Sequence, residues 1–436
     1  MLLLALSLSL ALADPSLAAR VQVASAERFL DSVGVVTHVA YFDTAYARWP
    51  ELVERLRELG VRNLRDDAYA NPAASWRDWN RRYLSAIERA RRNGLRFLFA
   101  LGAPGFAGGS AEQLVAAVAT ELRGAAAALE APNELDHFDG TEGWEQRLRV
   151  YTRRLRELID ARPELRALPF VGPSFGSWDG PASAGSLADW FDVCNAHPYP
   201  GGLPANPARV ALEIARLRPV CGSPTRVWAT EAGYHNALGA RSAQPGVPEG
   251  IAAAYVPALL LEFFKDGIER TYLYELVDEL PDPAGRDAER HYGLLRYDLT
   301  PKPAFVAVRN LLRTVRAPRS EGGRARSAGI SANVFAPRTV RSLLLRRSDG
   351  RAVVALWRTD PLWDPSRQRR LEVPVLRVRL ALDGGKPLAV VDPTTGAVGR
   401  PPRFEDGTLR IALDGSPRLV VVAGDRGAVA GDRGAQ

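Results

Sequence analysis

The chain has 436 residues, more than a single core usually accommodates, so its length predicts two domains. With 46% hydrophobic and 25% charged residues, the composition is that of an ordinary globular protein and excludes disordered and fibrous classes. Arginine carries almost all of the net charge of +7, but acidic residues are interspersed and no basic run contains interleaved aromatic residues, so we expect no nucleic-acid partner.

The first twenty residues, MLLLALSLSLALADPSLAAR, form an apolar run that ends in small residues. This run is too short to span a bilayer, and residues 11–13 and 16–18 both match the small-x-small pattern of a cleavage site. We therefore predict a signal peptide over residues 1–19 and a secreted or extracytoplasmic protein. No other segment is long and apolar enough for a membrane helix, so we expect no membrane insertion.

From residue 30 onward the chain repeats a short apolar run, a polar or glycine-rich end and a longer amphipathic segment. Residues 49–60, for example, place apolar side chains at i, i+3, i+4 and i+7 and stop at Gly60, which is typical of a helix. Strands that alternate with helices predict a parallel sheet, and eight repeats favour a closed (β/α)8 TIM barrel over an open doubly wound sheet. The strand-like runs are 32–39, 61–67, 95–104, 126–134, 168–176, 190–200, 225–233 and 271–279, and the other helical segments are 76–94, 143–165, 205–218, 250–267 and 300–316.

Past residue 327 the rhythm changes to short alternating stretches. Segments 342–358, 377–392 and 408–424 each contain two such stretches around Asp-Gly or Gly-Gly, which is the signal of a β-hairpin. We predict a catalytic barrel over residues 20–318, a small antiparallel β-sandwich domain over 319–425 and a flexible tail over 426–436. We also expect a monomer.

The chain has two cysteines, Cys194 and Cys221. They are able to pair in an exported protein if their Cα atoms lie within roughly 7 Å, and the sequence leaves this open. No histidine cluster with metal-ligand spacing accompanies them, so we expect no metal site. No G-x-G-x-x-G follows the first strand and no G-x-S-x-G is present, which excludes a dinucleotide fold and a serine hydrolase elbow and leaves no cofactor to expect.

Two glutamates follow predicted strands at the end of the barrel where chemistry is located. Glu134, preceded by Asn133, follows the fourth strand, and Glu231 follows the seventh, 231 − 134 = 97 residues later. Neither strand has a structural use for a carboxylate at its apolar end. Glycoside hydrolysis needs such a pair, one carboxyl group as proton donor and the other as nucleophile or base.

Other side chains at the strand ends are expected to bind the substrate. Arg65 and Tyr199 are placed to hydrogen-bond Glu231 and keep it charged, and Asn133 to donate to a sugar hydroxyl. His197 lies two residues from Tyr199, so both side chains share one face of a strand. The remaining expected contacts are His38 and Glu275 and the aromatic rings of Trp178, Tyr234 and Tyr274.

These motifs resemble the glycoside hydrolases of clan A, which share a (β/α)8 barrel, an Asn-Glu after strand 4 and a catalytic Glu after strand 7. APNELD (131–136) is similar to the first motif, WATEAGYH (228–235) to the second and CNAHPYP (194–200) to the His-x-Tyr segment after strand 6. HYGLLRYDLTPKPAF (291–305) resembles the segment that closes the barrel. The small β-domain makes family 39 the nearest match.

The resemblance implies a retaining hydrolase of β-linked oligo- or polysaccharides, with Glu134 as the general acid/base and Glu231 as the nucleophile. Clan members usually have a tryptophan at the end of strand 8, whereas this chain reads YLYELVDE (272–279), so Tyr274 or Glu275 is expected to support the sugar instead. Two alternatives remain open. One is a catalytically silent carbohydrate-binding barrel, and the other is a transglycosylase that uses the same two glutamates.

Overall fold

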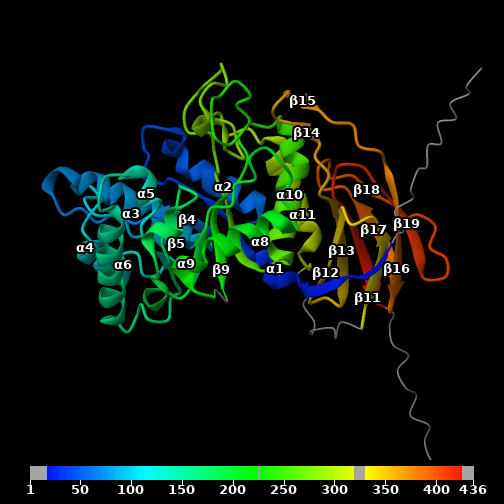
Figure 1. The fold of residues 1–436 in the computed structure, drawn as a ribbon, viewed down its shortest axis with the longest axis horizontal. Helices are drawn as coiled ribbons and strands as arrows, with labels where there is room; N and C mark the ends of the chain where they lie inside the picture. The colour runs from blue at the N-terminus through cyan, green and yellow to red at the C-terminus, as the bar shows by residue number, and fades with distance from the viewer. Residues whose placement is uncertain (1–16, 224–225, 319–328, 425–436) are drawn as a thin grey trace, which may run out of the picture.

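The computed structural model describes residues 17–223, 226–318 and 329–424, which form a barrel and a β-domain side by side (Figure 1). The barrel contains an 8-stranded parallel sheet in which successive strands are neighbours and the last strand pairs with the first. A parallel bridge between Val171 and Val193 closes the ring, so the predicted (β/α)8 barrel is confirmed. The strands are β3 (Val33–Val36), β4 (Asn63–Asp67), β5 (Arg96–Ala100), β6 (Ala126–Glu130), β7 (Phe170–Val171), β8 (Cys194–Ala196), β9 (Val227–Ala232) and β10 (Ile268–Leu273).

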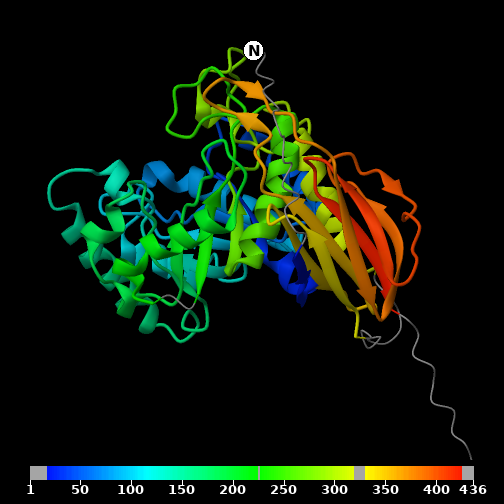
Figure 2. The same cartoon turned by 45° about the vertical axis from the view of Figure 1, so that its right-hand side comes forward.

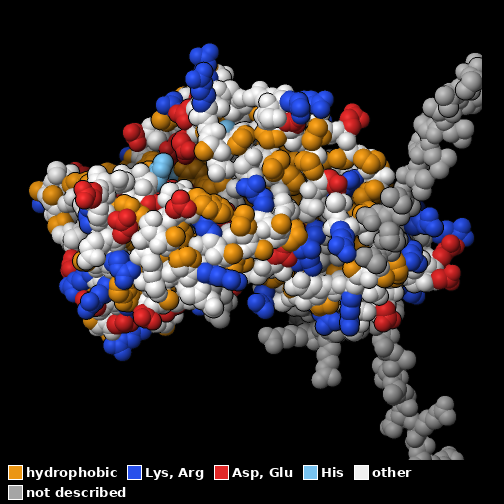
Figure 3. Space-filling model, viewed as in Figure 1, with side chains coloured by type: hydrophobic (Ala, Val, Ile, Leu, Met, Phe, Trp, Pro, Cys, Tyr) orange, Lys and Arg blue, Asp and Glu red, His pale blue; other side chains and the backbone are white. Residues whose placement is uncertain are grey.

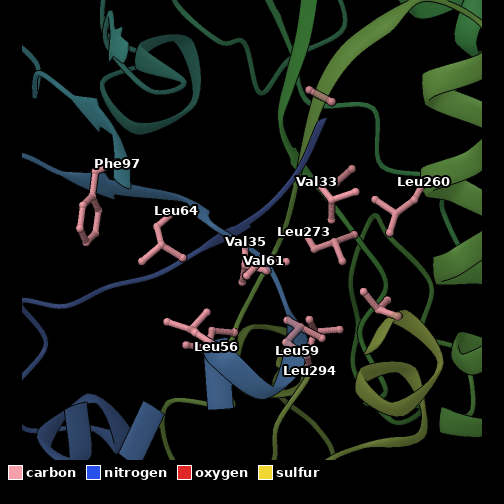
Figure 4. Close-up of a cluster of buried hydrophobic side chains, with 14 of the residues drawn as sticks. Val33, Val35, Leu56, Leu59, Val61, Leu64, Phe97, Leu260, Leu273 and Leu294 are labelled. Atoms are coloured by element: carbon pink, nitrogen blue, oxygen red, sulfur yellow. The ribbon is translucent and has the colours of Figure 1, made fainter. Parts of the chain in front are cut away.

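Helices surround the barrel and bury their apolar faces against its strands. Figure 4 shows Leu64 of β4 and Leu273 of β10 in a cluster that includes Leu56 and Leu260 from surrounding helices, and all four side chains are buried. The longer helices are α2 (Trp49–Leu59), α3 (Arg77–Arg92), α4 (Ala111–Ala119), α6 (Trp144–Asp160), α8 (Pro207–Arg216), α10 (Glu249–Lys265) and α11 (Pro303–Val315), and the shorter ones are α1 (Ala26–Ser32), α5 (Leu135–Phe138), α7 (Gly180–Ala184) and α9 (Arg218–Cys221).

The β-domain is a sandwich of two sheets around a core of its own (Figure 2). One sheet has four strands in the order β1-β11-β16-β19, and the other has six in the order β18-β17-β20-β13-β12-β2. The strands are β1 (Leu17–Arg20), β2 (Gln22–Ser25), β11 (Ser331–Ala336), β12 (Val340–Arg346), β13 (Arg351–Arg358), β16 (Leu376–Asp383), β17 (Gly385–Val391), β18 (Val398–Gly399), β19 (Thr408–Leu413) and β20 (Arg418–Gly424), and β14 (Trp363–Asp364) and β15 (Arg369–Arg370) form a separate two-stranded ribbon.

The N-terminal strands belong to the β-domain. β1 pairs with β11, and β2 pairs with β12, so residues 20–25 lie in the sandwich although the sequence analysis assigned them to the barrel. Their partners are some 300 positions away in the chain, as in Arg20 with Asn333, and no local pattern reveals such a pairing. Residues 1–16 of the predicted signal peptide and the predicted tail 426–436 lie outside the described residues.

Of the three predicted hairpins, one is confirmed and two are wrong. β12 and β13 pair around Asp349-Gly350, but β16 pairs with β19 and β17 pairs with β20. The chain therefore crosses from one sheet to the other at Gly384-Gly385, where Gly384 has φ +69° and a Cβ on Gly385 would come within 2.7 Å of the Ala423 carbonyl oxygen. Strand alternation is the same on both sides of a hairpin and of a crossing, so the pattern does not distinguish them.

The six-stranded sheet packs against α10 and α11 of the barrel, and polar contacts join it to α10. The fully buried Trp357 donates from Nε1 to Glu262 Oε2 at 2.6 Å, and Arg341 binds Glu262 and Asp266 at 3.0 and 2.7 Å. Burial is the largest of the causes that raise the pKa of Glu262 to about 8. The apolar side chains of this contact belong to the same cluster as the barrel core, so the outer face of the six-stranded sheet extends that core, while the inside of the sandwich has its own. No helix in the described ranges has the length and apolarity needed to cross a membrane.

Candidate active site

A cavity of about 890 Å³ opens at the carboxyl ends of the barrel strands. This is the end at which barrels of this type place their functional side chains. Acidic and basic side chains are interspersed over the molecular face in Figure 3, without an extended patch of one sign. Most of the residues expected from the sequence line the cavity, namely His38, Arg65, Asn133, Glu134, Trp178, His197, Tyr199, Glu231 and Tyr274.

Glu134 and Glu231 face one another across this cavity. Glu134 lies directly before α5 with φ +41°, and Glu231 lies within β9. A carboxylate oxygen of each glutamate and a ring nitrogen of His197 all lie within 4.8 Å of one another. The backbone approaches closely here, because a Cβ on Gly176 would come within 3.0 Å of Glu134 Oε2.

A buried arginine links Glu231 to a carboxylate that sequence reasoning missed. Arg65 donates from Nε and Nη2 to the two oxygens of Glu130, both at 2.8 Å, and from Nη1 to Glu231 Oε1 at 2.7 Å. Arg65 Nη2 also reaches Asn133 Oδ1 at 2.7 Å. Glu130 is fully buried. Its position as a charged residue at the end of the apolar run 126–130 is the feature of the sequence that could have identified it as a site residue. Charged donors of this fork shape fix a carboxylate in position.

Tyr199 holds the second oxygen of Glu231. Its hydroxyl donates to Oε2 at 2.7 Å, so each oxygen of Glu231 has a donor. Burial and then the charge of Glu231 raise the pKa of Tyr199 well above its ordinary value, which keeps the phenol protonated and able to donate. The predicted contacts of Arg65 and Tyr199 with Glu231 are both present.

His197 carries a proton that it shares with Glu134. Nδ1 lies 2.6 Å from Glu134 Oε1, and Nε2 lies 3.0 Å from the Thr230 hydroxyl, which donates to Asn195 Oδ1 at 2.8 Å. Since the hydroxyl proton is used there, His197 Nε2–H is the donor to Thr230. Burial lowers the pKa of His197, but the charges of Glu231 and Glu134 outweigh it and raise that pKa above its usual value.

The pKa of Glu134 moves in the opposite direction. Burial raises it, yet the hydrogen bond and the charge of His197 leave the pKa of Glu134 below its usual value. The two opposite shifts favour an imidazolium and a carboxylate, joined by a hydrogen bond along which the proton can move.

Two predicted substrate contacts do not line the cavity. Tyr234 lies past the end of β9 and is buried in the core, where its ring packs against Tyr255 of α10 and its hydroxyl donates to the Leu203 carbonyl at 2.8 Å. Glu275 is buried behind His38, whose Nδ1 lies 3.2 Å from Glu275 and 2.6 Å from Glu279. Burial raises the pKa of Glu275 to about 8. Glu279 reaches the cavity instead.

The wall of the cavity carries further polar groups that the sequence did not single out as substrate contacts. Asp66 accepts hydrogen bonds from the Thr37 hydroxyl and the Val39 N–H, at 2.6 and 2.9 Å, and burial raises the pKa of Asp66 to about 7. Four carboxylates line the cavity from β4 and from the segment after β10, whereas two guanidinium groups line it from α8, together with the carboxylate of Glu213. The carboxylates are Asp66, Asp67, Glu279 and Glu289, and the guanidinium groups are those of Arg209 and Arg216.

Two groups of side chains in the described residues have the spacing of metal ligands. One comprises His38, Glu275 and Glu279, and the other Glu134, His197 and Glu231. The second group has the guanidinium of Arg65 2.7 Å from Glu231, and this positive charge opposes a cation. In both groups the histidine Nδ1 lies within hydrogen-bond distance of a carboxylate, so hydrogen bonding accounts for their proximity.

No protein-family model and no curated protein sequence matches this chain. Among solved structures, a glucosidase from Croceicoccus marinus superposes with a TM-score of 0.52 at 12% identity, over 85% of this chain and 91% of the glucosidase. β-Glucuronidase 2 of Bacteroides uniformis gives 0.48 at 14% identity, over 87% of this chain and 45% of the glucuronidase, so this chain spans less than half of that protein. Gas2p of Saccharomyces cerevisiae gives 0.42 at 13% identity, over 65% and 64%. The chain therefore shares the fold of the glucosidase, a (β/α)8 barrel with an attached β-domain.

Proposed function

We propose that the protein is a retaining glycoside hydrolase of the clan A type that acts on a β-linked oligo- or polysaccharide. The observation that carries this proposal is the close approach of Glu134 and Glu231, because a carboxylate oxygen of one lies within 4.8 Å of a carboxylate oxygen of the other. Retaining enzymes keep their two carboxyl groups about 5–5.5 Å apart, whereas inverting enzymes separate them by about 6.5–9.5 Å to admit water. The short separation favours retention, and membership of family 39 stays a prediction.

The contacts assign one role to each glutamate. Glu231, oriented through both oxygens by Arg65 and Tyr199, attacks the anomeric carbon and forms a glycosyl-enzyme ester. Glu134 must be protonated to help the leaving oxygen depart, and the proton reaches it from His197 Nδ1 across the 2.6 Å hydrogen bond. Once the leaving group has gone, Glu134 takes a proton from water, which attacks the ester and releases the sugar with retained configuration.

Glu134→Gln tests the acid/base role through the leaving group. We expect kcat/KM for a substrate with a poor leaving group to fall by about 10²–10⁴-fold, while formation of the glycosyl-enzyme from a dinitrophenyl glycoside, which needs no protonation, changes little. In the wild type, kcat/KM should fall as the pH rises through the raised pKa of His197, because the pair then loses its proton. For Glu134→Gln acting on the dinitrophenyl glycoside, kcat/KM should not show this fall at alkaline pH.

Glu289→Gln is the matched control, since Glu289 is an exposed carboxylate that lines the same cavity. It should keep the alkaline decline and the dependence on the leaving group. An equal loss of rate for both leaving groups in Glu134→Gln would contradict the assignment. Product analysis at high acceptor concentration separates hydrolysis from transglycosylation, and oligosaccharide binding without any turnover would indicate the silent barrel.

We also propose that the protein is exported and monomeric. Cys194 and Cys221 form a disulfide with Cα atoms 6.0 Å apart, and such bonds persist in oxidising compartments. Because residues 17–20 pair with β11, cleavage after Ala13 leaves β1 whole, whereas cleavage after Ala18 removes half of it. We therefore replace the predicted boundary of the signal peptide, residues 1–19, by residues 1–13 and expect the mature chain to begin at Asp14. N-terminal sequencing of protein recovered outside the cytoplasm checks this, and a start at Ala19 would show that β1 is dispensable.

A further inference from the structure

The outward face of the four-stranded sheet carries arginines without counter-ions. Arg20 on β1, Arg377 and Arg379 on β16 and Arg410 on β19 are all exposed. Among the described residues none of the four forms a hydrogen bond or an ion pair with a carboxylate. Most other described arginines of the β-domain do form an ion pair with a carboxylate, as Arg418 does with Asp414. We call this set of four residues the arginine face.

The strand register places like charges directly against each other. Arg379 is the direct partner of Arg410 on one side and of Phe335 on the other, and its guanidinium lies 3.5 Å from the centre of the Phe335 ring. Directly opposed residues have Cβ atoms about 5 Å apart, and like charges in this position repel each other. The arrangement is unfavourable for the sheet alone and becomes favourable when an anion lies between the two guanidinium groups.

The surroundings of this pair leave room for a ligand. Ala381 and Ala412 are small neighbours on the same face, and a cavity of about 240 Å³ is lined by Phe335, Pro337 and the arginines at 377, 379 and 410. Arg377 and Arg379 are two residues apart on one strand, so they repeat at roughly 7 Å along the sheet. A guanidinium binds a carboxylate through two parallel hydrogen bonds, which suits a chain of regularly spaced anionic groups.

We propose that the arginine face binds a polyanionic polysaccharide through its carboxylate groups. The face is flat and presents no helix or ribbon to enter a DNA groove, and the choice of a polysaccharide over other polyanions also rests on the proposed glycosidase function. The four-stranded sheet is the layer away from α10 and α11, on the far side of the β-domain from the barrel (Figures 1 and 2). Binding there leaves the catalytic cavity open and holds a long polymer on the same molecule, which raises the local substrate concentration.

Affinity electrophoresis in native gels that contain polygalacturonate, with dextran as the uncharged comparison, tests this proposal. The wild type should be retarded by polygalacturonate and not by dextran, and added salt should weaken the retardation. R379Q/R410Q should weaken binding at least fivefold, with a melting temperature equal to or above that of the wild type because the repulsion is removed. The matched control R369Q/R370Q removes two exposed arginines from β15 of the same domain and should bind like the wild type.

The proposal is overturned if the wild type is not retarded, if the two double variants bind equally, or if duplex DNA binds more tightly than polygalacturonate. The assay measures binding and not turnover, so its failure is distinct from a failure of the proposed function. Hydrolysis of a small uncharged aryl glycoside, measured on the same preparations, should be the same in both double variants and in the wild type.

Discussion

Glu231→Ala is expected to reduce hydrolysis by about 10⁴-fold or more, because the variant lacks the group that forms the covalent intermediate. The fold should be retained, since Arg65 keeps its two hydrogen bonds to Glu130 and its bond to Asn133 when the bond to Glu231 is lost. Steady-state rates on an aryl glycoside measure the loss, and circular dichroism checks the fold. Full activity in this variant would refute the assignment of Glu231.

Azide distinguishes the two glutamates by the configuration of the product. In Glu231→Ala a small anion fits the space of the missing carboxylate and attacks the anomeric carbon directly, so the glycosyl azide has inverted configuration. In Glu134→Ala azide attacks the ester on Glu231 instead, and two displacements give net retention. NMR of the products reads the outcome. Retained azide from Glu231→Ala and inverted azide from Glu134→Ala would exchange the two roles, and inverted azide from both variants would contradict a covalent intermediate on Glu231.

Arg65→Leu is expected to lower the free energy of unfolding by about 3–5 kcal/mol, because it leaves the fully buried Glu130 without its cationic partner. Activity should fall as well, since Glu231 loses the donor to Oε1. Chemical denaturation followed by tryptophan fluorescence measures the first effect. Because the chain has two domains, the midpoint for the barrel is compared and not a single global transition.

The double variant Arg65→Leu/Glu130→Leu separates stability from function. Replacing both members of a buried ion pair by apolar residues is often neutral, so most of the lost stability should return. Activity should not return, because Tyr199 alone remains to orient Glu231. Equal stability of Arg65→Leu and the wild type would show that the pair contributes nothing to the fold, and recovery of activity in the double variant would contradict the positioning role of Arg65.

Local sequence patterns were sufficient to predict the barrel and most of the residues that line its cavity. Each strand and helix has its own period of apolar residues, and eight alternations leave few topologies to choose from. The carboxyl ends of parallel strands meet at one mouth, so polar residues such as Asn133, Glu134 and Glu231 at those ends were expected to meet. That expectation needs no knowledge of the packing between strands.

Contacts between distant segments were decided by packing alone. Glu130 sits inside an apolar strand, and only the closed barrel brings Arg65, Asn195 and Thr230 to it. The same holds for His197, whose pKa is raised by Glu231 and Glu134 and whose Nε2 contacts a hydroxyl 33 residues away in the sequence. The pattern of apolar residues along the sequence does not reveal contacts of this kind.

The sequence by itself therefore determined the element order, the barrel and the pair of glutamates at its mouth. Only the tertiary structure decided that Tyr234 is buried in the core, that β16 and β17 belong to different sheets and that residues 17–25 join the β-domain. The physical reason is the distance along the sequence over which each signal acts. Periodicity reports which face of an element is buried, whereas the partner that buries it is selected by the free energy of the whole fold.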